Sequence, residues 1–258
     1  MFKYNLDDKK KFIENGYVVK KIFGKNNSFI DFSNKLNNDL IFIEKKNYVK
    51  NLGGYRSGNL NIDLGIYSEE IINLLLKSNF SEYFNYITGD NIDNFEISTG
   101  GNLNLPGSKK QLFHTDGNWS PRMIIVNIAP TNININNGPI EILEKSHIRN
   151  LPYWKFLLDC KKFNPKKIQL DLGDVLIREH RLWHRGTRNN SNKFREMVGV
   201  MLIKKENTKK IKEYLTKPKL YSNMFDNNLK GKLLEFIFLH FKILLVIYKL
   251  FLSLKSKQ

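Results

Sequence analysis

Two stretches of the sequence decide the fold: 111–117, which reads QLFHTDG, and 172–195, which reads LGDVLIREHRLWHRGTRNNSNKFR. His114 and Asp116 lie two positions apart in the first stretch. Residues i and i+2 of a β-strand point to the same face of a sheet, so an imidazole and a carboxylate would project side by side. One further imidazole from a distant strand would complete a set of three metal ligands.

Such a set has a recognisable chemistry. Two histidines and one carboxylate occupy one face of an octahedral metal ion and leave its other positions open, which is the ligand pattern of non-haem Fe(II) oxygenases. A lone His-x-Asp pair also arises by chance, so its meaning depends on the surrounding sequence. The second stretch offers two histidines for the third position, His180 and His184.

The rest of the chain reads as short strands separated by turns. Two segments have the apolar spacing of helices, 7–15 and 69–86. Strand patterns, which include the His-Thr-Asp segment itself, occur at 17–23, 93–105, 114–116, 123–129, 140–143, 167–172, 175–177 and 195–203. The Gly-Gly pair at 100–101 predicts a bulge or kink. The pattern predicts a mostly β fold with flanking helices, whose core is a double-stranded β-helix of the jelly-roll, cupin-like kind.

Composition excludes several classes of protein. With 41% hydrophobic and 12% aromatic residues in 258, the chain can bury a core and is not disordered throughout. The single cysteine, Cys160, excludes an internal disulfide and indicates a reducing compartment. The first twelve residues are charged and contain no apolar run, so no secretory signal is expected. These features predict a cytoplasmic protein.

Positive charge is concentrated toward the C-terminus. The chain has a net charge of +17, and residues 204–258 hold 13 Lys against four acidic residues, a net charge of +9. Such a segment suits anionic lipid, glycan or nucleic acid, and a solvated basic segment explains it equally well. No zinc-finger spacing, helix-turn-helix pattern or aromatic RNA-binding signature is present, so nucleic acid is not an expected partner.

The tail contains a 22-residue, mostly apolar segment at 233–254. Glu235, Lys242 and Lys249 are spaced by seven and form one polar row on a helix, which Lys232 and Ser253 extend. Three arrangements remain open: a helix lying on a membrane surface, a helix packed on its own domain or a dimer mate, and a membrane span, which the central Lys242 disfavours. We expect a catalytic domain at 1–205, a basic linker and amphipathic helix at 206–258, and peripheral membrane contact through 226–258.

Four motifs, in order, resemble a known family. They are FIENGYVV at 12–19, PGSKKQLFHTD at 106–116, NGPIEILEKSH at 137–147, and the distal stretch that ends in LWH at 182–184 with Arg195 following. Together they resemble the phytanoyl-CoA dioxygenase family of Fe(II)/2-oxoglutarate oxygenases over about residues 7–203. Glu144 and Lys145 replace the family's Pro-Gly turn, and Arg185 follows the distal histidine.

The resemblance implies cofactors and a ligand set. It implies Fe(II) held by His114, Asp116 and His184, with 2-oxoglutarate as co-substrate and O2 as oxidant. His184 is favoured over His180 because it precedes Arg195 by 11 residues, the spacing that the resemblance implies. His147 falls at the family's turn position, where a structural hydrogen bond is usual.

Further residues are implied around the co-substrate. Arg195 would bind the distal carboxylate of 2-oxoglutarate through two parallel hydrogen bonds, which lysine cannot reproduce. The other expected co-substrate contacts are Thr187, Ser191, Asn127, Asn102 and Asn104.

The implied activity is hydroxylation of an unactivated C–H bond of a small-molecule or lipid-linked substrate, with succinate and CO2 as co-products. Related halogenases carry a small residue in place of Asp116, so the carboxylate favours hydroxylation. The alternative is a catalytically lapsed jelly-roll that serves as a binding module at a membrane. An intact ligand set and Arg195 count against it.

Overall fold

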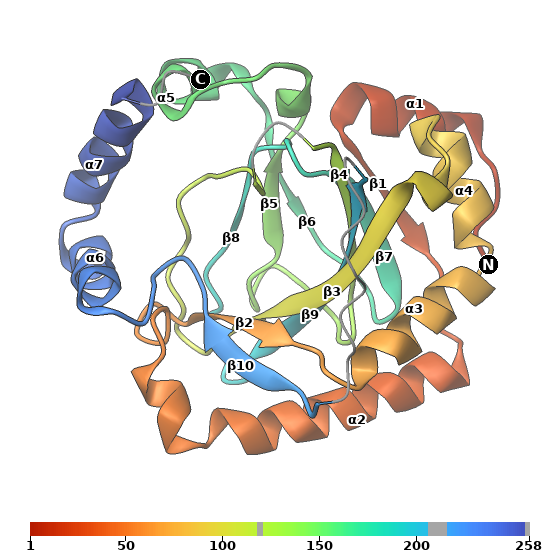
Figure 1. The fold of residues 1–258 in the computed structure, drawn as a ribbon, viewed down its shortest axis with the longest axis horizontal. Coiled ribbons are helices and arrows are strands. Elements are labelled where there is room, and N and C mark those ends of the chain that lie inside the picture. The colour runs from red at the N-terminus through yellow and green to blue at the C-terminus, as the bar shows by residue number, and fades with distance from the viewer. Residues whose placement is uncertain (118–120, 206–215, 256–258) are drawn as a thin grey trace.

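Two antiparallel sheets form the centre of the protein (Figure 1). The computed structural model describes residues 1–117, 121–205 and 216–255. Within these residues the larger sheet has seven strands in the order β1-β7-β4-β9-β3-β2-β10. Its strands are β1 (Tyr17–Lys21), β2 (Asn59–Asp63), β3 (Phe95–Asn104), β4 (Met123–Ile128), β7 (Asp174–Glu179), β9 (Arg195–Lys204) and β10 (Lys219–Ser222).

A smaller sheet faces the larger one. Its order is β6-β5-β8, and its strands are β5 (Ile140–Leu143), β6 (Pro165–Ile168) and β8 (His184–Gly186). Ile142 and Ile168 of this sheet pack with Leu176 and Met197 of the larger sheet in one buried cluster. Because inward side chains of both sheets meet there, the expected jelly-roll core with flanking helices is confirmed.

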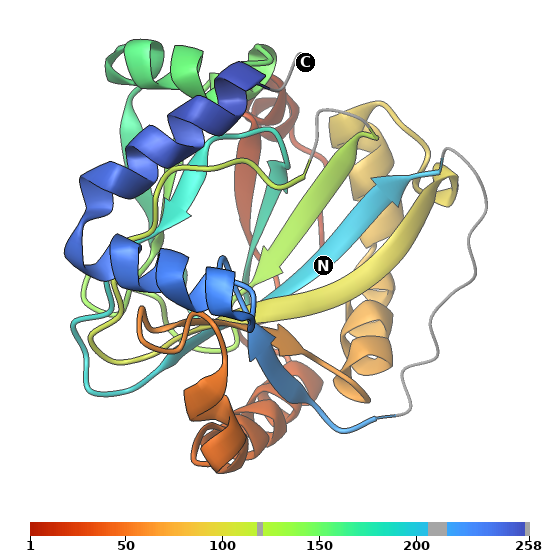
Figure 2. The same ribbon diagram turned by 60° about the vertical axis from the view of Figure 1, so that its left-hand side comes forward.

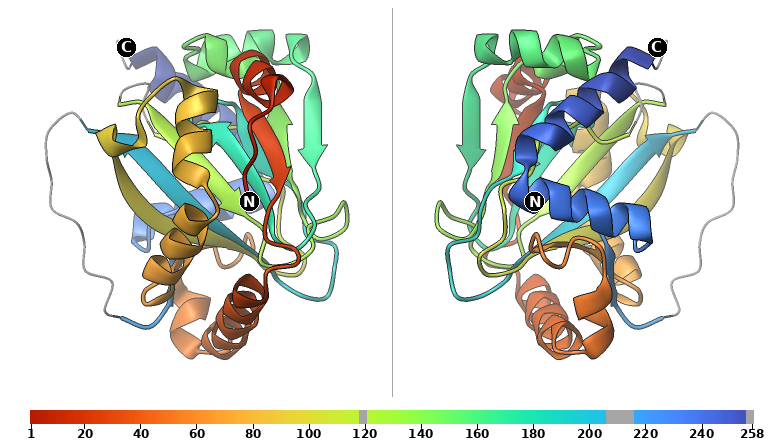
Figure 3. Two further views of the ribbon diagram at one scale, coloured as in Figure 1. Left: turned by 90° about the vertical axis from the view of Figure 1, so that its right-hand side faces the viewer. Right: turned by 90° about the vertical axis from the view of Figure 1, so that its left-hand side faces the viewer.

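Helices cover the outer face of the larger sheet on one side of the molecule (Figure 3, left). They are α1 (Leu6–Asn15), α2 (Asn27–Glu44), α3 (Tyr67–Lys77) and α4 (Phe80–Thr88). The main buried cluster joins Phe29, Leu36 and Phe84 of these helices to Ile177 and Val198 of the sheet. The two helices α3 and α4 replace the single helix expected over 69–86, since Asn79 takes a left-handed conformation (φ 65°) between them.

The remaining helical segments are short or lie near the C-terminus. Helix α5 (Tyr153–Asp159) follows the smaller sheet, and four 3-10 turns occur at Asn47–Asn51, Ile92–Asn94, Ser146–Ile148 and Cys160–Lys162. The tail forms α6 (Leu229–His240) and α7 (Lys242–Lys255) rather than the single helix expected over 233–254. The break falls at Phe241, whose backbone (φ −135°, ψ 53°) is outside the helical region. None of the described helices is long and apolar enough to cross a membrane.

The tail is attached to the rest of the structure at several points. Strand β10 pairs with β2, so residues 219–222 belong to the larger sheet. Helices α6 and α7 lie across the side of the molecule opposite α1 and α4 (Figures 1 and 2). Residues 206–215, the first part of the basic linker expected at the start of 206–258, lie outside the described residues. A division at residue 205 stays a prediction.

The polar row of the tail points toward the domain. The Glu235 carboxylate accepts a hydrogen bond of 2.9 Å from the Ser57 backbone N–H. The Lys242 amine donates a hydrogen bond of 3.0 Å to the Lys110 carbonyl. The side of the tail that faces solvent exposes apolar side chains. They are Leu229, Leu233, Phe236, Phe241, Ile243, Leu244, Ile247, Phe251, Leu252 and Leu254.

Strand β3 runs past its Gly-Gly pair without a bulge. Gly100 and Gly101 pair with Gly199 and Val198 of β9 in unbroken register, so the predicted bulge is wrong. A glycine is required at position 101 for a different reason. A Cβ atom there would lie 2.5 Å from the Met197 carbonyl oxygen. Gly101 therefore permits the close approach of β3 and β9, the strands that carry Asn102 and Arg195.

We expect Gly101→Ala to lower the free energy of unfolding by about 1–3 kcal/mol, because the new methyl group would push β3 and β9 apart. Gly100→Ala is the matched control. Its Cβ would meet only the Ile62 carbonyl at 3.4 Å and Met201 at 3.8 Å, so we expect a neutral or slightly stabilising change. Equilibrium urea denaturation measures both. Equal destabilisation by the two substitutions would contradict the close-approach explanation.

Candidate metal centre and co-substrate cavity

The two sequence motifs meet through a single backbone pairing. His184 begins β8, and His114 pairs with it as an isolated antiparallel bridge. Each residue donates its backbone N–H to the other's carbonyl at 3.0 Å. The His-Thr-Asp segment is therefore not a regular strand, contrary to expectation, because only this one bridge holds it to β8. The pairing sets the two imidazole rings beside each other, with ring centroids 4.4 Å apart.

The backbone also fixes the orientation of both rings. The Nδ1 atom of His114 lies 3.0 Å from the Leu112 carbonyl, and that of His184 lies 2.9 Å from the Leu182 carbonyl. A carbonyl only accepts, so each Nδ1 carries the proton and each Nε2 keeps a lone pair. Burial lowers the pKa of both rings, that of His184 to about 3, so both are neutral bases near pH 7.

Asp116 completes the cluster. Its backbone N–H donates to the His180 carbonyl at 3.0 Å, which holds the residue in place. One carboxylate oxygen, Oδ2, lies 3.4 Å from His184 Nε2 and 2.7 Å from a terminal nitrogen of Arg178. Burial alone would raise the pKa of this carboxyl, but the neighbouring His184 and Arg178 outweigh burial and hold the pKa well below its usual range.

The three side chains suit a metal ion. One ligand atom from each of His114, Asp116 and His184 lies within 4.8 Å of the others. Asp116 Oδ2 is buried and makes no hydrogen bond of good geometry, although it is in contact with the Arg178 charge. Two imidazole lone pairs and an anionic oxygen that converge in this way are the donor set of a divalent transition metal.

The other two candidate histidines lie elsewhere. The Nδ1 atom of His180 is 2.8 Å from the Met123 carbonyl, and the residue is not part of the three-member cluster. The Nε2 atom of His147 is 3.1 Å from the Ile13 carbonyl, which ties the turn after β5 to α1. This contact matches the structural role expected for His147.

A cavity of about 130 Å³ opens beside the three ligands on the inner face of the larger sheet. The strand register explains its lining. Directly opposed residues of antiparallel strands point to the same face. Asn59, Asn104 and Arg195 stand opposite one another across β2, β3 and β9, and Asn61, Asn102 and Met197 form the next row. We call this space the inner cavity.

Arg195 is the buried cation of the inner cavity. Its terminal nitrogens donate to Asn102 Oδ1 at 2.8 Å and to the Gly138 carbonyl at 3.1 Å. Its Nε is buried and has no hydrogen-bond partner within the described part of the chain. Burial lowers the pKa of the guanidinium to about 10, so it is charged near pH 7. Among the described residues no carboxylate forms an ion pair with Arg195, and the nearest charge interaction is with its chain neighbour Glu196, which does not line the cavity.

The structure brings together most of the expected co-substrate residues. Asn127, Asn102 and Asn104 line the inner cavity with Arg195. Thr187 and Ser191 do not line it. The Thr187 hydroxyl donates to the Pro139 carbonyl and the Ser191 hydroxyl to Asn189 Oδ1, both at 2.6 Å. Their hydroxyls are used to hold the β8–β9 connection rather than to face the cavity.

Sequence reasoning missed Arg178. Its Nε donates to Asn127 Oδ1 at 3.0 Å, and its Nη1 is buried without a partner. A charged residue inside the apolar strand 174–179 was the available signal. Other lining residues that the sequence analysis did not assign are Asn59, Asn61, Gln111 and Asn223. Gln111 connects the two motifs directly, because its side-chain oxygen accepts from the Gly186 N–H at 2.8 Å.

Residues 80–197 match the family model described as phytanoyl-CoA dioxygenase (PhyH). This segment of the chain is therefore similar to the phytanoyl-CoA dioxygenase family. The matched segment contains His114, Asp116, His184 and Arg195, and the sequence resemblance is thereby confirmed.

Solved structures share the fold. The non-heme alpha ketoglutarate dependent carbocyclase SnoK from nogalamycin biosynthesis is 16% identical, with a TM-score of 0.62 over 78% of this chain and 84% of that one. The epimerase SnoN, in complex with Fe3+, alpha ketoglutarate and nogalamycin RO, is 12% identical, with a TM-score of 0.63 over 76% and 82%. EctD from S. alaskensis with bound Fe is 13% identical, with a TM-score of 0.61 over 83% of each chain. At these identities the likeness shows the fold alone.

We expect His184→Ala and Asp116→Ala to weaken binding of a divalent metal by about 100-fold or more, because each removes a direct ligand. His180→Asn is the control, since asparagine keeps a polar atom near the Met123 backbone. Cobalt(II) titration followed by visible absorption measures the affinities. A loss in His180→Asn as large as that in His184→Ala would overturn the assignment of the third ligand.

Proposed function

We propose that the protein is an Fe(II)- and 2-oxoglutarate-dependent dioxygenase that hydroxylates an unactivated C–H bond of a small-molecule or lipid-linked substrate. The co-products would be succinate and CO2. The observation that carries the proposal is the meeting of three metal-ligand side chains with a buried arginine that has no counter-ion in the same cavity.

The inner cavity suits a dicarboxylate. Arg195 lies in the row next to Asn102 and has a buried Nε without a partner, so a carboxylate entering the cavity would meet a desolvated, preoriented guanidinium. His114 and His184 present Nε2 lone pairs at the other side of the same space. A molecule that chelates the metal at one end and pairs with Arg195 at the other would use both the metal site and the arginine.

Bound Fe(II) would supply the activation of O2 together with 2-oxoglutarate. The side chains of this chain would hold the reactants: the three ligands fix the metal, and Arg195 fixes the co-substrate. Asp116 as a third protein ligand leaves no vacancy for a halide, which favours hydroxylation over halogenation. Similar folds perform carbocyclisation and epimerisation, so the outcome on this chain depends on how its substrate is placed.

A catalytically lapsed binding module is the alternative. Such a protein would keep the fold but lose metal or co-substrate binding. The ligand cluster and Arg195 are both present and oriented into one cavity, and this favours the enzyme.

We further propose that the outer surface of α6 and α7 contacts an anionic lipid bilayer. Both helices turn apolar rows to solvent, with Leu229 exposed by 85% and Ile243 by 72%. The two helices are also basic, with five Lys against one Glu over residues 229–255, a net charge of +4. Exposed apolar rows on a cationic segment complement anionic headgroups above an acyl layer. A second copy of the chain would cover the apolar rows, but it carries the same positive charge and would not neutralise that of the helices.

Co-substrate binding tests the dioxygenase proposal. Without oxygen, Fe(II) and 2-oxoglutarate should produce a weak visible charge-transfer band in the wild-type protein. We expect Arg195→Ala to raise the dissociation constant of 2-oxoglutarate by about 100-fold or more, because a buried charge pair loses one partner. Arg188→Ala is the control, since Arg188 is exposed in the same connection. Folded wild-type protein that binds Fe(II) but gives no band would support the lapsed module.

Vesicle flotation tests the membrane proposal. We expect the wild-type protein to float with vesicles that contain phosphatidylserine and not with neutral vesicles. The double substitution Ile243→Asp and Ile247→Asp should abolish flotation, because both side chains are exposed on α7. Ile13→Asp is the control, since Ile13 is exposed on α1 at the opposite side of the molecule. Wild-type protein that stays unbound, or dimerises through these residues, would refute lipid contact.

A further inference from the structure

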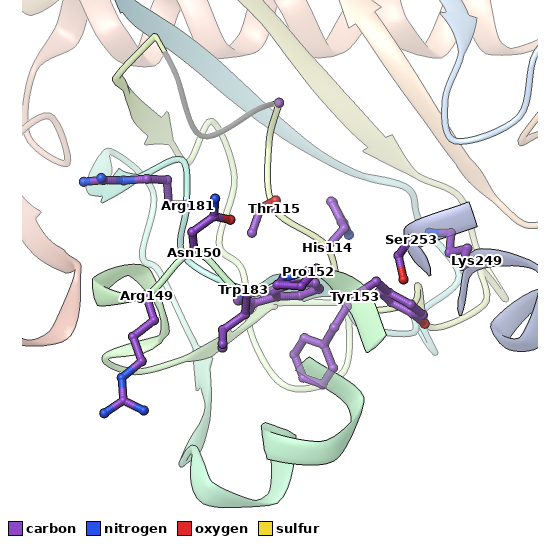
Figure 4. Close-up of a pocket in the computed structure, with 13 residues that line it drawn as sticks. His114, Thr115, Arg149, Asn150, Pro152, Tyr153, Arg181, Trp183, Lys249 and Ser253 are labelled. Atoms are coloured by element: carbon purple, nitrogen blue, oxygen red, sulfur yellow. The ribbon is translucent and has the colours of Figure 1, made fainter. Parts of the chain in front are cut away.

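A second, larger cavity lies on the other side of His114. It has a volume of about 300 Å³ (Figure 4). Its walls are formed by residues 113–117, which contain the His-Thr-Asp segment, by residues 149–153 at the start of α5, by residues 181–183 before β8, and by helix α7. His114 lines both this outer cavity and the inner cavity. The proposed metal centre therefore stands between the two spaces. Since the inner cavity suits the co-substrate, the outer cavity is the place for the substrate.

The outer cavity is cationic. Arg149, Arg181 and Lys249 line it, and none of its described lining residues is acidic, although Arg181 pairs with Glu179 at 3.2 Å. Figure 4 shows Lys249 and Ser253 at one end of the cavity and the two arginines at the other, with His114 and Trp183 between them. The rings of Phe113, Tyr153 and Trp183 supply apolar wall between these charged ends.

Among the three cations of the outer cavity, Lys249 says most about what the cavity binds. It belongs to α7, outside the segment that matches the family model. No carboxylate lies within ion-pair distance of its amine among the described residues, and the contact it makes is with the Tyr153 ring, 5.8 Å from the centroid. Burial lowers the pKa of this amine, and its charge reaches His114, whose pKa it lowers. A largely buried ammonium without a counter-ion is costly unless a ligand supplies one.

The other polar row members of the tail contrast with Lys249. Glu235 is satisfied by the Ser57 N–H and Lys242 by the Lys110 carbonyl. Ser253 accepts the Trp154 backbone N–H at 3.3 Å. These three attach the tail to the domain through backbone groups. Lys249 has no such partner and faces the cavity instead.

We propose that the outer cavity binds a substrate with an anionic group, a carboxylate or phosphate, attached to an apolar body, and that Lys249 of the C-terminal helix is a ligand of the anion. This inference rests on the proposed function for the role of the bound molecule as substrate. The anion would pair with Lys249, while the apolar body would lie against Tyr153 and Trp183 and bring a C–H bond to His114 and the metal. The tail is then part of the binding site.

Direct binding to the full-length protein tests this, without any turnover. The protein is loaded with Mn(II) and saturated with 2-oxoglutarate, so that the inner cavity is filled. The probes are phenyl phosphate and phenylacetate, which distinguish phosphate from carboxylate, and benzyl alcohol as the uncharged counterpart. Calorimetric titration gives the dissociation constants. We expect at least one anion to bind, and the alcohol to bind at least 10-fold more weakly.

Four proteins are compared: wild type, Lys249→Met, Lys249→Arg and Lys242→Met. We expect Lys249→Met to weaken the anion about 10-fold or more, Lys249→Arg to stay within about 3-fold of wild type, and Lys242→Met to be unchanged. Lys242 is the matched control, since it lies two turns earlier on the same helix and does not line the cavity. Equal weakening by both methionine substitutions, or no anion binding to wild type, would overturn the proposal.

Stability separates binding from a purely structural role. If the Tyr153 contact is the purpose of Lys249, Lys249→Met should lower the melting temperature of the unliganded protein. If the amine instead serves to bind an anion, unliganded Lys249→Met should have a melting temperature equal to or higher than that of wild type. The reason is that the substitution removes an unpaired buried charge. The Fe(II)/2-oxoglutarate band should persist in Lys249→Met. Loss of that band in wild type would refute the dioxygenase, whereas loss of anion binding alone would refute this inference.

Discussion

The mutual backbone pairing of His114 and His184 is the contact on which the site depends. Two hydrogen bonds of 3.0 Å join segments that are 70 positions apart in the sequence, and they bring two imidazoles to the same point. Once the pairing exists, the local carbonyls of Leu112 and Leu182 orient the rings with Nε2 outward. The bridge is short, so its geometry relies on the surrounding sheets. Gln111 adds a side-chain clamp to β8 on one side, and the Asp116 N–H bonds to His180 on the other.

Charge balance explains the character of both cavities. Arg178 and Arg195 are buried in the inner cavity, and Asp116 is the acidic residue among its described lining. A divalent metal would add further positive charge, which makes the space a site for a dianion. The outer cavity is lined by Lys249, by the exposed Arg149 and by Arg181, which pairs with Glu179. Burial penalises Arg195 and Lys249 in the free protein, and bound anions would offset that cost.

Local patterns in the sequence predicted the fold class and the pairing of His114 with Asp116, whereas the third ligand, His184, was predicted from the resemblance to a known family. Alternating strands, the His-x-Asp spacing and the distance from His184 to Arg195 are visible without tertiary information. Helix α2 was missed because four asparagines lower its helix propensity, although Phe29, Phe32, Leu36, Leu40 and Ile43 follow helical spacing. Arg178 was missed because its partner, Asn127, lies on a different strand. The hydrogen bonds of Thr187 and Ser191 could not be predicted, because the partner of a hydroxyl group is decided by the loop that surrounds it.

The tail shows why periodicity alone does not determine orientation. The row of Glu235, Lys242 and Lys249 was visible in the sequence, yet spacing cannot say whether a polar row faces water or protein. Backbone groups of the domain decide it, since the Ser57 N–H and Lys110 carbonyl lie where the row passes. A straight helix over the 27 residues from Leu229 to Lys255 would extend about 40 Å, and the break at Phe241 lets both halves follow the domain. The consequence is a helix with two chemically different faces. One face supplies a cation to the outer cavity, and the other presents apolar side chains outward. A lipid-linked anion would satisfy both, because its apolar chain could stay in the bilayer while its charged end reaches Lys249.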